Sequence, residues 1–353
     1  MWHALSHQRR AWYESVSDAS LSPFSDADGT GLDARQQIAD LIRRLRQAAD
    51  HLPADRTAHD DLKILSQTLR ELRRAFTVFA PYRTQRKVTV FGSARTPRDA
   101  RSYKHAEKLG RAMADSGWFV VTGASTGIME AGHRGAGRDR SMGLNIMLPF
   151  EQESNDVIRG DHKLVTMKYF FTRKLMFVKE CDAVVCLPGG FGTLDEAFEV
   201  LTLLQTGKRE LMPVVFLDAP GGTYWKNWLA FVRGNLLADG MISPEDLSLF
   251  RVTESVDETV AEILGFYRVF HSMELINNRL VVRVTKKLTQ RLLAGLQRDF
   301  ADILVEGIFR QESVVLGESV RPDFDGLSRL VFHFNRRSLG RLRQLIDVVN
   351  AQA

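Results

Sequence analysis

The chain has 353 residues, of which 44% are hydrophobic and 26% are charged. This balance is typical of a soluble globular protein rather than of a disordered or membrane protein. No apolar run approaches the roughly 18 to 20 residues that span a bilayer, and residues 1–20 lack the apolar core of a signal peptide. We therefore expect a cytoplasmic protein with no membrane partner.

The formal net charge is +5, yet Arg and Lys alternate with Asp and Glu along most of the chain. Mixed charge is typical of a solvated surface, so no nucleic-acid polymer is expected as a partner, whereas a small anionic ligand is compatible with it. Cys181 and Cys186 are the two cysteines. If they share a strand they lie on opposite faces about 16 Å apart, so we expect buried free thiols in a reducing compartment.

Residues 33–79 have apolar positions at helical spacing. The pattern predicts two amphipathic helices, interrupted at residues 52–55. The apolar faces are expected to pack against the main domain or another subunit. They carry Ile38, Leu41, Ile42 and Leu45, and then Leu62, Leu65, Leu69 and Leu72.

From Lys87 onward, short β-branched runs alternate with helical stretches. This pattern predicts an α/β fold with a Rossmann-like parallel sheet and helices on both faces. Strands are predicted at residues 87–91, 119–122, 143–148, 163–167, 182–187 and 214–217.

After about Phe270, strands at residues 280–284 and 330–334 and helices at 288–300 and 339–349 predict a small α+β unit. We divide the chain into an N-terminal helical extension (1–86), a Rossmann-like domain (87–270) and a C-terminal α+β appendage (271–353). The appendage is expected to serve packing or oligomerisation.

A glycine-rich loop, Pro188–Thr193, follows one predicted strand and opens a helix predicted over residues 194–204. Glycines and a helix N-terminus bring backbone N–H groups close to an anion, so the loop predicts a phosphate site. It has neither the lysine of a Walker loop nor the dinucleotide fingerprint, which argues against a dehydrogenase. Two more turns fall at the same sheet edge and should contribute Gly92, Ser93, Gly123 and Gly127 to the ligand site.

Glu196 has two interpretations. The spacing from Thr193 is that of a capping box, in which the carboxylate only bonds the start of the helix, and spacing alone favours this. Beside a phosphate loop, however, a carboxylate can hold water or stabilise an oxocarbenium-like sugar. Both interpretations stay open on the spacing.

Arg173 and Lys174 open another predicted helix. Cations there oppose the helix dipole, which favours ligand binding over two solvated surface charges. Glu130 either accepts hydrogen bonds from a ribose or complements a helix dipole, while Glu151 and Gln152 follow a strand at the ligand edge. The nine histidines form no pair at metal-ligand spacing, so no metal is predicted.

Four motifs together resemble the LONELY GUY family in its longer bacterial branch, which is often mislabelled as lysine-decarboxylase-like. They are Pro188–Glu196, Gly127–Ala131, Leu144–Gln152 and Tyr169–Lys174, and the likeness spans residues 87–270. The resemblance implies hydrolysis of the N-glycosidic bond of a nucleoside 5′-monophosphate, such as AMP or a cytokinin riboside monophosphate. The products would be free base and ribose 5-phosphate, no cofactor is implied, and such proteins form homodimers or larger assemblies with sites near the interface.

Carried onto this chain, the resemblance implies that Arg173 and Glu196 are the catalytic pair. Lys174, Glu151 and Thr202 would complete the substrate contacts. The phosphate would be held by Gly189, Gly190, Phe191, Gly192, Thr193, Leu194 and Asp195.

One segment departs from the family pattern. Residues 123–127 read Gly-Ala-Ser-Thr-Gly where the family has a denser glycine run, so the side chains at 124–126 are expected to narrow access to the backbone there. The rival function is a Rossmann-like carrier that binds a nucleotide or phosphorylated cofactor without hydrolysing it. The presence of both Arg173 and Glu196 argues against the carrier.

Overall fold

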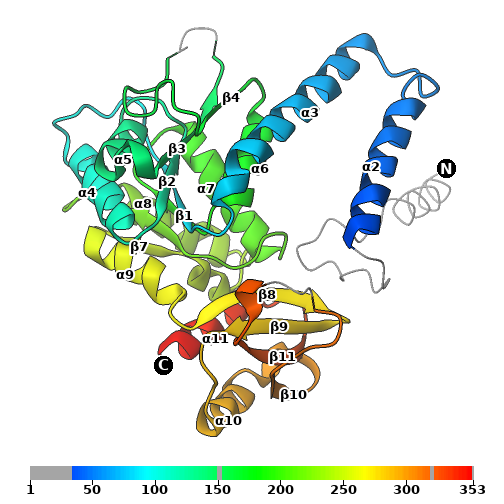
Figure 1. The fold of residues 1–353 in the computed structure, drawn as a ribbon. Coiled ribbons are helices and arrows are strands. Elements are labelled where there is room, and N and C mark those ends of the chain that lie inside the picture. Colours follow the sequence, from blue (N-terminus) through cyan, green and yellow to red (C-terminus); the bar gives the residue numbers. More distant parts are fainter. Residues whose placement is uncertain (1–33, 149–152, 319–321, 352–353) are drawn as a thin grey trace, which may run out of the picture.

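The computed structural model describes residues 34–148, 153–318 and 322–351. Its larger layer is a seven-stranded sheet in the order β4-β3-β2-β1-β5-β6-β7, in which all neighbouring strands are parallel (Figure 1). The strands are β1 (Lys87–Phe91), β2 (Phe119–Thr122), β3 (Ser141–Ile146), β4 (Leu164–Met167), β5 (Ala183–Cys186), β6 (Val214–Leu217) and β7 (Arg251–Thr253).

Helices cover both faces of this sheet because alternate strand residues point to opposite sides. Val88 and Val90 of β1, for example, face one layer, whereas Phe91 faces the other. The first layer contains α4 (Arg101–Asp115), α5 (Ile128–Ala136) and α9 (Val256–Phe266). The second contains α3 (His59–Phe79), α6 (Phe170–Glu180), α7 (Phe191–Gln205) and α8 (Tyr224–Phe231).

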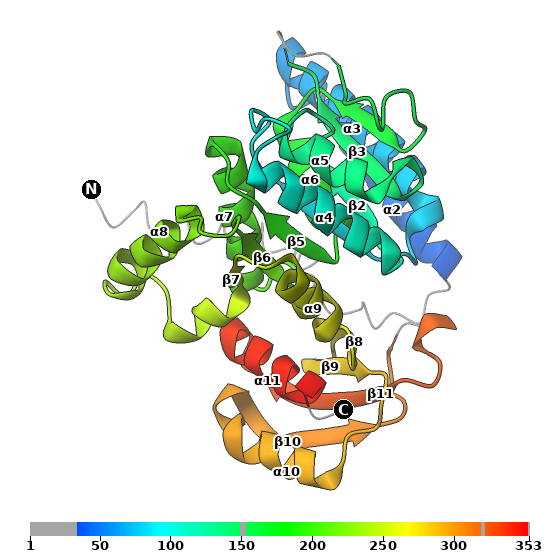
Figure 2. The same cartoon turned by 90° about the vertical axis from the view of Figure 1, so that its left-hand side faces the viewer.

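A smaller antiparallel sheet, in the order β10-β11-β9-β8, forms the C-terminal part. Figure 2 shows helix α11 between this sheet and the larger domain. Buried Asn350 of α11 joins the parts, since it donates to the Phe266 carbonyl and accepts from the N–H groups of Val269 and Phe270. The elements are β8 (Phe270–Ile276), β9 (Arg279–Val284), α10 (Gln290–Asp299), β10 (Leu304–Glu312), β11 (Ser328–Phe334) and α11 (Leu339–Ala351).

Short helical turns connect these elements. They are η2 (Ala80–Tyr82), η3 (Arg138–Arg140), η4 (Val232–Leu237), η5 (Pro244–Leu249), η6 (Ala301–Ile303) and η7 (Pro322–Phe324).

Both N-terminal helices were predicted to pack against the main domain or another subunit, and only part of one of them packs against the domain. The C-terminal half of α3 buries Glu71, Ala75 and Phe79 against the domain. Helix α2 (Ala34–His51) extends away from it (Figure 1), and the apolar residues of its stripe, such as Leu41 and Leu45, are exposed.

The predicted α/β class is confirmed, and the six predicted strands of the main sheet are present within about two residues of their expected ends. Strands β7, β8 and β10 were not predicted. Both cysteines are buried and free as predicted, but Cys181 precedes β5 and shares one core layer with Cys186, so their expected placement on opposite faces is wrong. The described helices include none long and apolar enough to cross a membrane. The three-part division of the chain stays a prediction.

Candidate functional site

A cavity of about 760 Å³ opens at the carboxyl ends of β1 and β5. These two strands are neighbours at the centre of the sheet, where the strand order reverses, and ligands bind at such a point in open α/β sheets. The cavity is lined by Phe91, Gly92, Ser93, Ala94, Arg95, Gly123, Met129, Arg173, Phe177, Gly189, Gly190, Phe191, Gly192, Thr193, Leu194 and Glu196.

The turns that build the cavity are joined by backbone hydrogen bonds. The Ser93 N–H donates to the Pro188 carbonyl at 3.1 Å, and the Ser93 carbonyl accepts from the Ile128 N–H at 3.0 Å. A side chain at Gly189 would place its Cβ 2.1 Å from the Thr193 hydroxyl and 3.0 Å from the Ser93 nitrogen. Glycine at 189 is therefore required for the β1 and β5 turns to approach each other this closely.

The glycine-rich loop leads directly into helix α7, which begins at Phe191. Within the described chain, no hydrogen bond is formed by the N–H groups of Phe191 and Gly192. Free N–H groups at a helix N-terminus attract an anion. Beside them the Phe191 side chain is 93% exposed, although it is a large apolar group.

Glu196 is not part of a capping box. The residue that precedes α7 is Gly190, and the helix start has no side-chain cap, so Glu196 is the sixth helical residue rather than the third. Glu196 is only 4% exposed, and its Oε2 atom has no hydrogen-bond partner among the described residues. Burial raises the pKa of Glu196 to about 7, and the nearby Lys174 and Arg173 oppose this only in part. The capping interpretation is therefore wrong.

Arg173 reaches the same cavity from the first turns of α6. Its guanidinium lies 4.9 Å from the ring centroid of Phe170 and 5.7 Å from that of Phe177, and its Nε atom is buried without a partner in the described chain. Burial lowers the pKa of Arg173, and Glu196 and Asp195 oppose this shift. An arginine stays charged even so. With Arg95, the lining holds two cations and one carboxylate, a charge balance that favours an anionic ligand.

A residue of α3 holds the start of α6, the helix that carries Arg173. Glu71 of α3 accepts hydrogen bonds from the Thr172 hydroxyl at 2.6 Å and from the Lys168 N–H at 2.8 Å. It thereby anchors the start of α6 from the neighbouring helix. This role of Glu71 was not predicted, because in the sequence a glutamate on an amphipathic helix cannot be told from an ordinary solvated charge.

Two other contributors were also missed. The Tyr224 hydroxyl donates to the Gly189 carbonyl at 2.7 Å and braces the glycine loop. Met129 lines the cavity from α5. Tyr224 belongs to a helix that was not predicted, and nothing in its local sequence distinguishes it.

Several predicted contacts lie outside the cavity lining. Lys174 forms ion pairs with Asp195 at 3.0 Å and with Glu199. Burial lowers the pKa of Lys174, but these two carboxylates outweigh it and the net shift is upward. The exposed Thr202 donates to the Phe198 carbonyl in its own helix. The roles of Lys174, Asp195 and Thr202 as substrate contacts stay predictions.

Glu130 and Gly127 also lie away from the lining. Glu130 is buried and pairs with Arg98 at 2.5 Å. Gly127 has a φ of +64°, and a Cβ there would lie 2.3 Å from the Ser93 carbonyl oxygen, so this glycine closes the turn against its neighbour. Glu151 and Gln152 lie outside the described residues.

The expected narrowing at residues 124–126 is not seen. Ala124 adopts a left-handed φ of +59° and is fully buried against Gly143, while Thr126 donates to the Ala94 carbonyl. None of the three side chains lines the cavity. The alanine costs about 1 kcal/mol of backbone strain where a glycine would have none.

Comparison with known proteins identifies the family of the chain. A family model described as "Possible lysine decarboxylase" matches residues 122–263. The cytokinin riboside 5′-monophosphate phosphoribohydrolase of Rhodococcoides fascians is 31% identical over 193 residues, which cover 54% of this chain and 95% of that protein. The chain belongs to the LONELY GUY family.

Two further relatives of the LONELY GUY family are similar to about half of the chain. The Mycobacterium tuberculosis enzyme of that name is 28% identical over 180 residues, covering 49% of this chain and 90% of its own. A "probable" rice enzyme (Oryza sativa subsp. japonica) is 32% identical over 164 residues, 45% of this chain but only 63% of the relative. A solved structure of a molybdenum cofactor binding protein from Rippkaea orientalis is 21% identical to this chain. The match covers 51% of this chain and 95% of that one, with a TM-score of 0.37.

The buried Glu196 should make stability depend on pH. The pKa of Glu196 is raised from 4.5 to about 7 in the folded chain. Below pH 4.5 the protonated carboxyl therefore costs the folded state no stability, and the free energy of unfolding falls as the pH rises through 7 and the buried carboxyl ionises. Glu196→Gln should therefore gain stability over the parent across that window, reaching about 3 kcal/mol above pH 7. Urea unfolding at several pH values measures this. Glu107→Gln on α4 is the control, and a difference for Glu196→Gln that stays flat with pH would contradict the burial account.

Proposed function

We propose that the chain hydrolyses the N-glycosidic bond of a nucleoside 5′-monophosphate to free base and ribose 5-phosphate. The observation that carries the proposal is the unpartnered, buried Glu196 oxygen beside the unpartnered Nε of Arg173 in a cavity with free backbone N–H groups. A carboxyl held this way costs stability, and such groups cluster at catalytic sites. The three relatives described above are all named as phosphoribohydrolases, which supports the same reaction.

The loop and the arginine would hold the 5′-phosphate. The N–H groups of Phe191 and Gly192 and the Arg173 guanidinium supply donors, and binding energy from the phosphate then orients the sugar. Arg95 adds positive charge at the cavity wall. In this arrangement the ribose C1′ lies toward Glu196.

Glu196 would act on the sugar and the attacking water. As the C1′–N bond breaks, its electron pair leaves with the base, and the carboxylate stabilises positive charge at C1′. The water oxygen bonds to C1′, one water proton passes to Glu196, and that proton is then delivered to a ring nitrogen of the base. A pKa of about 7 suits a group that accepts and returns a proton at neutral pH.

Lysine decarboxylation is poorly supported by the same geometry. That chemistry needs a lysine free to form a Schiff base. Lys174 is instead paired with Asp195 and Glu199 and does not line the cavity. The carrier alternative needs the glycine loop but has no use for a buried, uncompensated carboxyl at 196.

Replacing the catalytic carboxyl should separate chemistry from binding. Glu196→Gln is expected to bind AMP within about threefold of the parent and to release adenine at least about a hundredfold more slowly, the scale for a positioned acid or base. Single-turnover assays with AMP, CMP, GMP and isopentenyladenosine monophosphate measure the rate. Glu199→Gln, one turn along α7, is the control and should lose less than tenfold. Equal losses in the two variants would contradict the assignment.

We further infer that a second copy of the chain covers the exposed apolar side of α6 and α7. Phe171 and Leu175 of α6 and Phe198 of α7 are large apolar groups exposed to solvent, and they lie on the two helices that carry Arg173 and Glu196. Apolar patches of this kind mark association surfaces. A dimer through these helices would bring the partner close to each site.

A charged side chain on the exposed apolar side of α6 should prevent dimer formation. Leu175→Asp is expected to convert a dimer to a monomer in light scattering, because a carboxylate cannot be buried unpaired in an apolar interface. Ile308→Asp, on the exposed side of β10, is the control and should leave the mass unchanged. A parent chain that is monomeric at micromolar concentration, or a Leu175→Asp dimer, would contradict this inference.

A further inference from the structure

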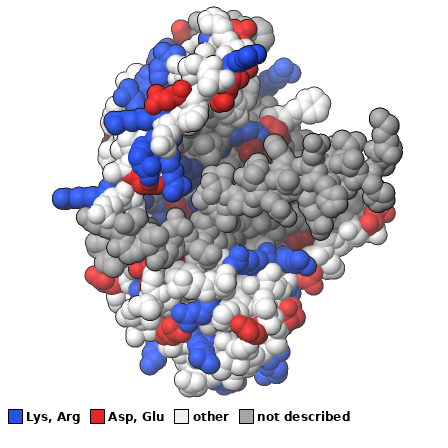
Figure 3. Space-filling view, turned by 90° about the vertical axis from the view of Figure 1, so that its right-hand side faces the viewer, with Lys and Arg blue, Asp and Glu red and all other residues white. Residues whose placement is uncertain are grey.

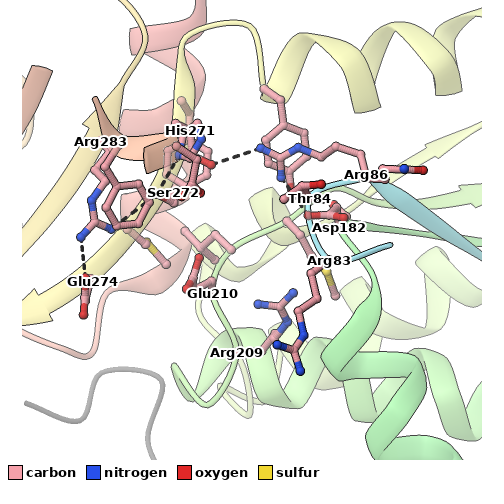
Figure 4. A pocket seen from close by; sticks show the side chains of 18 residues that line it. Arg83, Thr84, Arg86, Asp182, Arg209, Glu210, His271, Ser272, Glu274 and Arg283 are labelled. Carbon is pink, nitrogen blue, oxygen red and sulfur yellow. Dashed lines mark hydrogen bonds and ion pairs between the residues drawn. The ribbon is translucent and has the colours of Figure 1, made fainter. Parts of the chain in front are cut away.

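A second cavity, of about 470 Å³, lies at the opposite end of the main sheet. It is bounded by residues that precede β1, β5 and β6 and by strand β8 of the smaller sheet, as Figure 4 shows. Its size is that of a small-molecule site. The catalytic cavity shares no lining residue with it.

Four arginines line this second cavity, and two of them are fully engaged. Arg86 donates to Asp182 and to the His271 carbonyl and lies over the Tyr267 ring. Arg283 pairs with Glu274 and Glu318. The carboxylates in these pairs neutralise the positive charges of Arg86 and Arg283.

The other two arginines have no carboxylate partner among the described residues. Arg209 donates from Nε to the Val178 carbonyl at 3.2 Å and from its terminal nitrogen to the Cys181 carbonyl at 2.7 Å, which are neutral acceptors. Arg83 is exposed, and within the described chain its side chain forms no hydrogen bond or ion pair. Figure 4 shows both guanidinium groups in the same part of the cavity.

Four acids line the same cavity, and among the described residues none of them forms an ion pair with Arg83 or Arg209. The Asp182 carboxylate accepts hydrogen bonds from Arg86 and from the Lys87 N–H. Burial raises the pKa of Glu210, although the nearby Arg209 and Arg283 and a hydrogen bond from the Met273 N–H oppose this shift. Glu274 is paired with Arg283, and Asp323 also lines the cavity. Arg83 and Arg209 thus face one space without an ion pair of their own among the described residues, which favours an anionic ligand.

We propose that this second cavity binds a small phosphate monoester through Arg83 and Arg209. A phosphate monoester carries close to two negative charges and several acceptor oxygens, which matches the two arginines. Apolar groups of Met212, Phe270 and Met273 line the same space and would contact the remainder of the molecule. The proposal concerns binding alone and does not depend on the proposed hydrolysis.

Such a ligand would contact elements that also build the catalytic cavity. Arg209 holds carbonyl groups at the C-terminal end of α6, and Arg173 lies near the start of the same helix. Asp182 directly precedes β5, and the glycine loop directly follows it. The second cavity therefore lies at the far ends of two elements that position the catalytic one.

Isothermal titration with ribose 5-phosphate and with inorganic phosphate tests the proposal, with uncharged ribose as the blank. The titrations use full-length Arg173→Ala protein, in which the catalytic cavity is weakened. One saturable site per chain is expected, with no heat from ribose. Adding Arg83→Gln should weaken that site at least about tenfold, the size expected for losing a charged hydrogen bond.

Arg291→Gln, an exposed arginine of α10, is the matched control and should leave the affinity unchanged. Melting temperatures of all variants establish that each is folded. The proposal is overturned if Arg173→Ala protein binds neither phosphate compound, or if Arg83→Gln and Arg291→Gln bind alike. Base release from AMP is measured separately, so a failure here is distinct from a failure of the hydrolase assignment.

Discussion

The close approach of two turns, at the ends of β1 and β5, is the constraint on which the site depends. The Ser93 N–H bonds to the Pro188 carbonyl, and only a glycine at 189 leaves room for that contact. The same approach aligns the start of α7 with the cavity. Once α7 is fixed, its sixth residue, Glu196, points into a space that the glycine loop and α6 have already enclosed.

The electrostatics of the site follow from this enclosure. Burial keeps the Glu196 carboxyl poorly solvated and raises its pKa to about 7, and the same burial leaves Arg173 without a partner for its Nε atom. The fold thus holds two groups in a state that costs stability and that a phosphorylated sugar would relieve. Glu71 and Tyr224, from outside the recognised motifs, keep α6 and the loop in place for that ligand.

Much of the fold could be predicted from the sequence, because continuous β-branched runs separated by helices define a parallel sheet. β8 and β10 were missed because polar and charged residues, such as Glu274 in β8, interrupt them, so neither contains a continuous β-branched run. The glycine loop, Arg173 and Glu196 were recognisable as local motifs. The choice between cap and catalyst needed the true start of α7, and Glu71 and the arginine-lined cavity needed tertiary contacts that no local pattern contains.

The central claim is that water adds to C1′ of a bound nucleotide at this site. Incubating the purified chain with AMP in H₂¹⁸O and analysing the products by mass spectrometry tests it most directly. The account predicts equal amounts of adenine and ribose 5-phosphate, with one ¹⁸O in the sugar bound at C1′. Intact AMP that remains bound, or label found in the phosphate instead of the sugar, would contradict it.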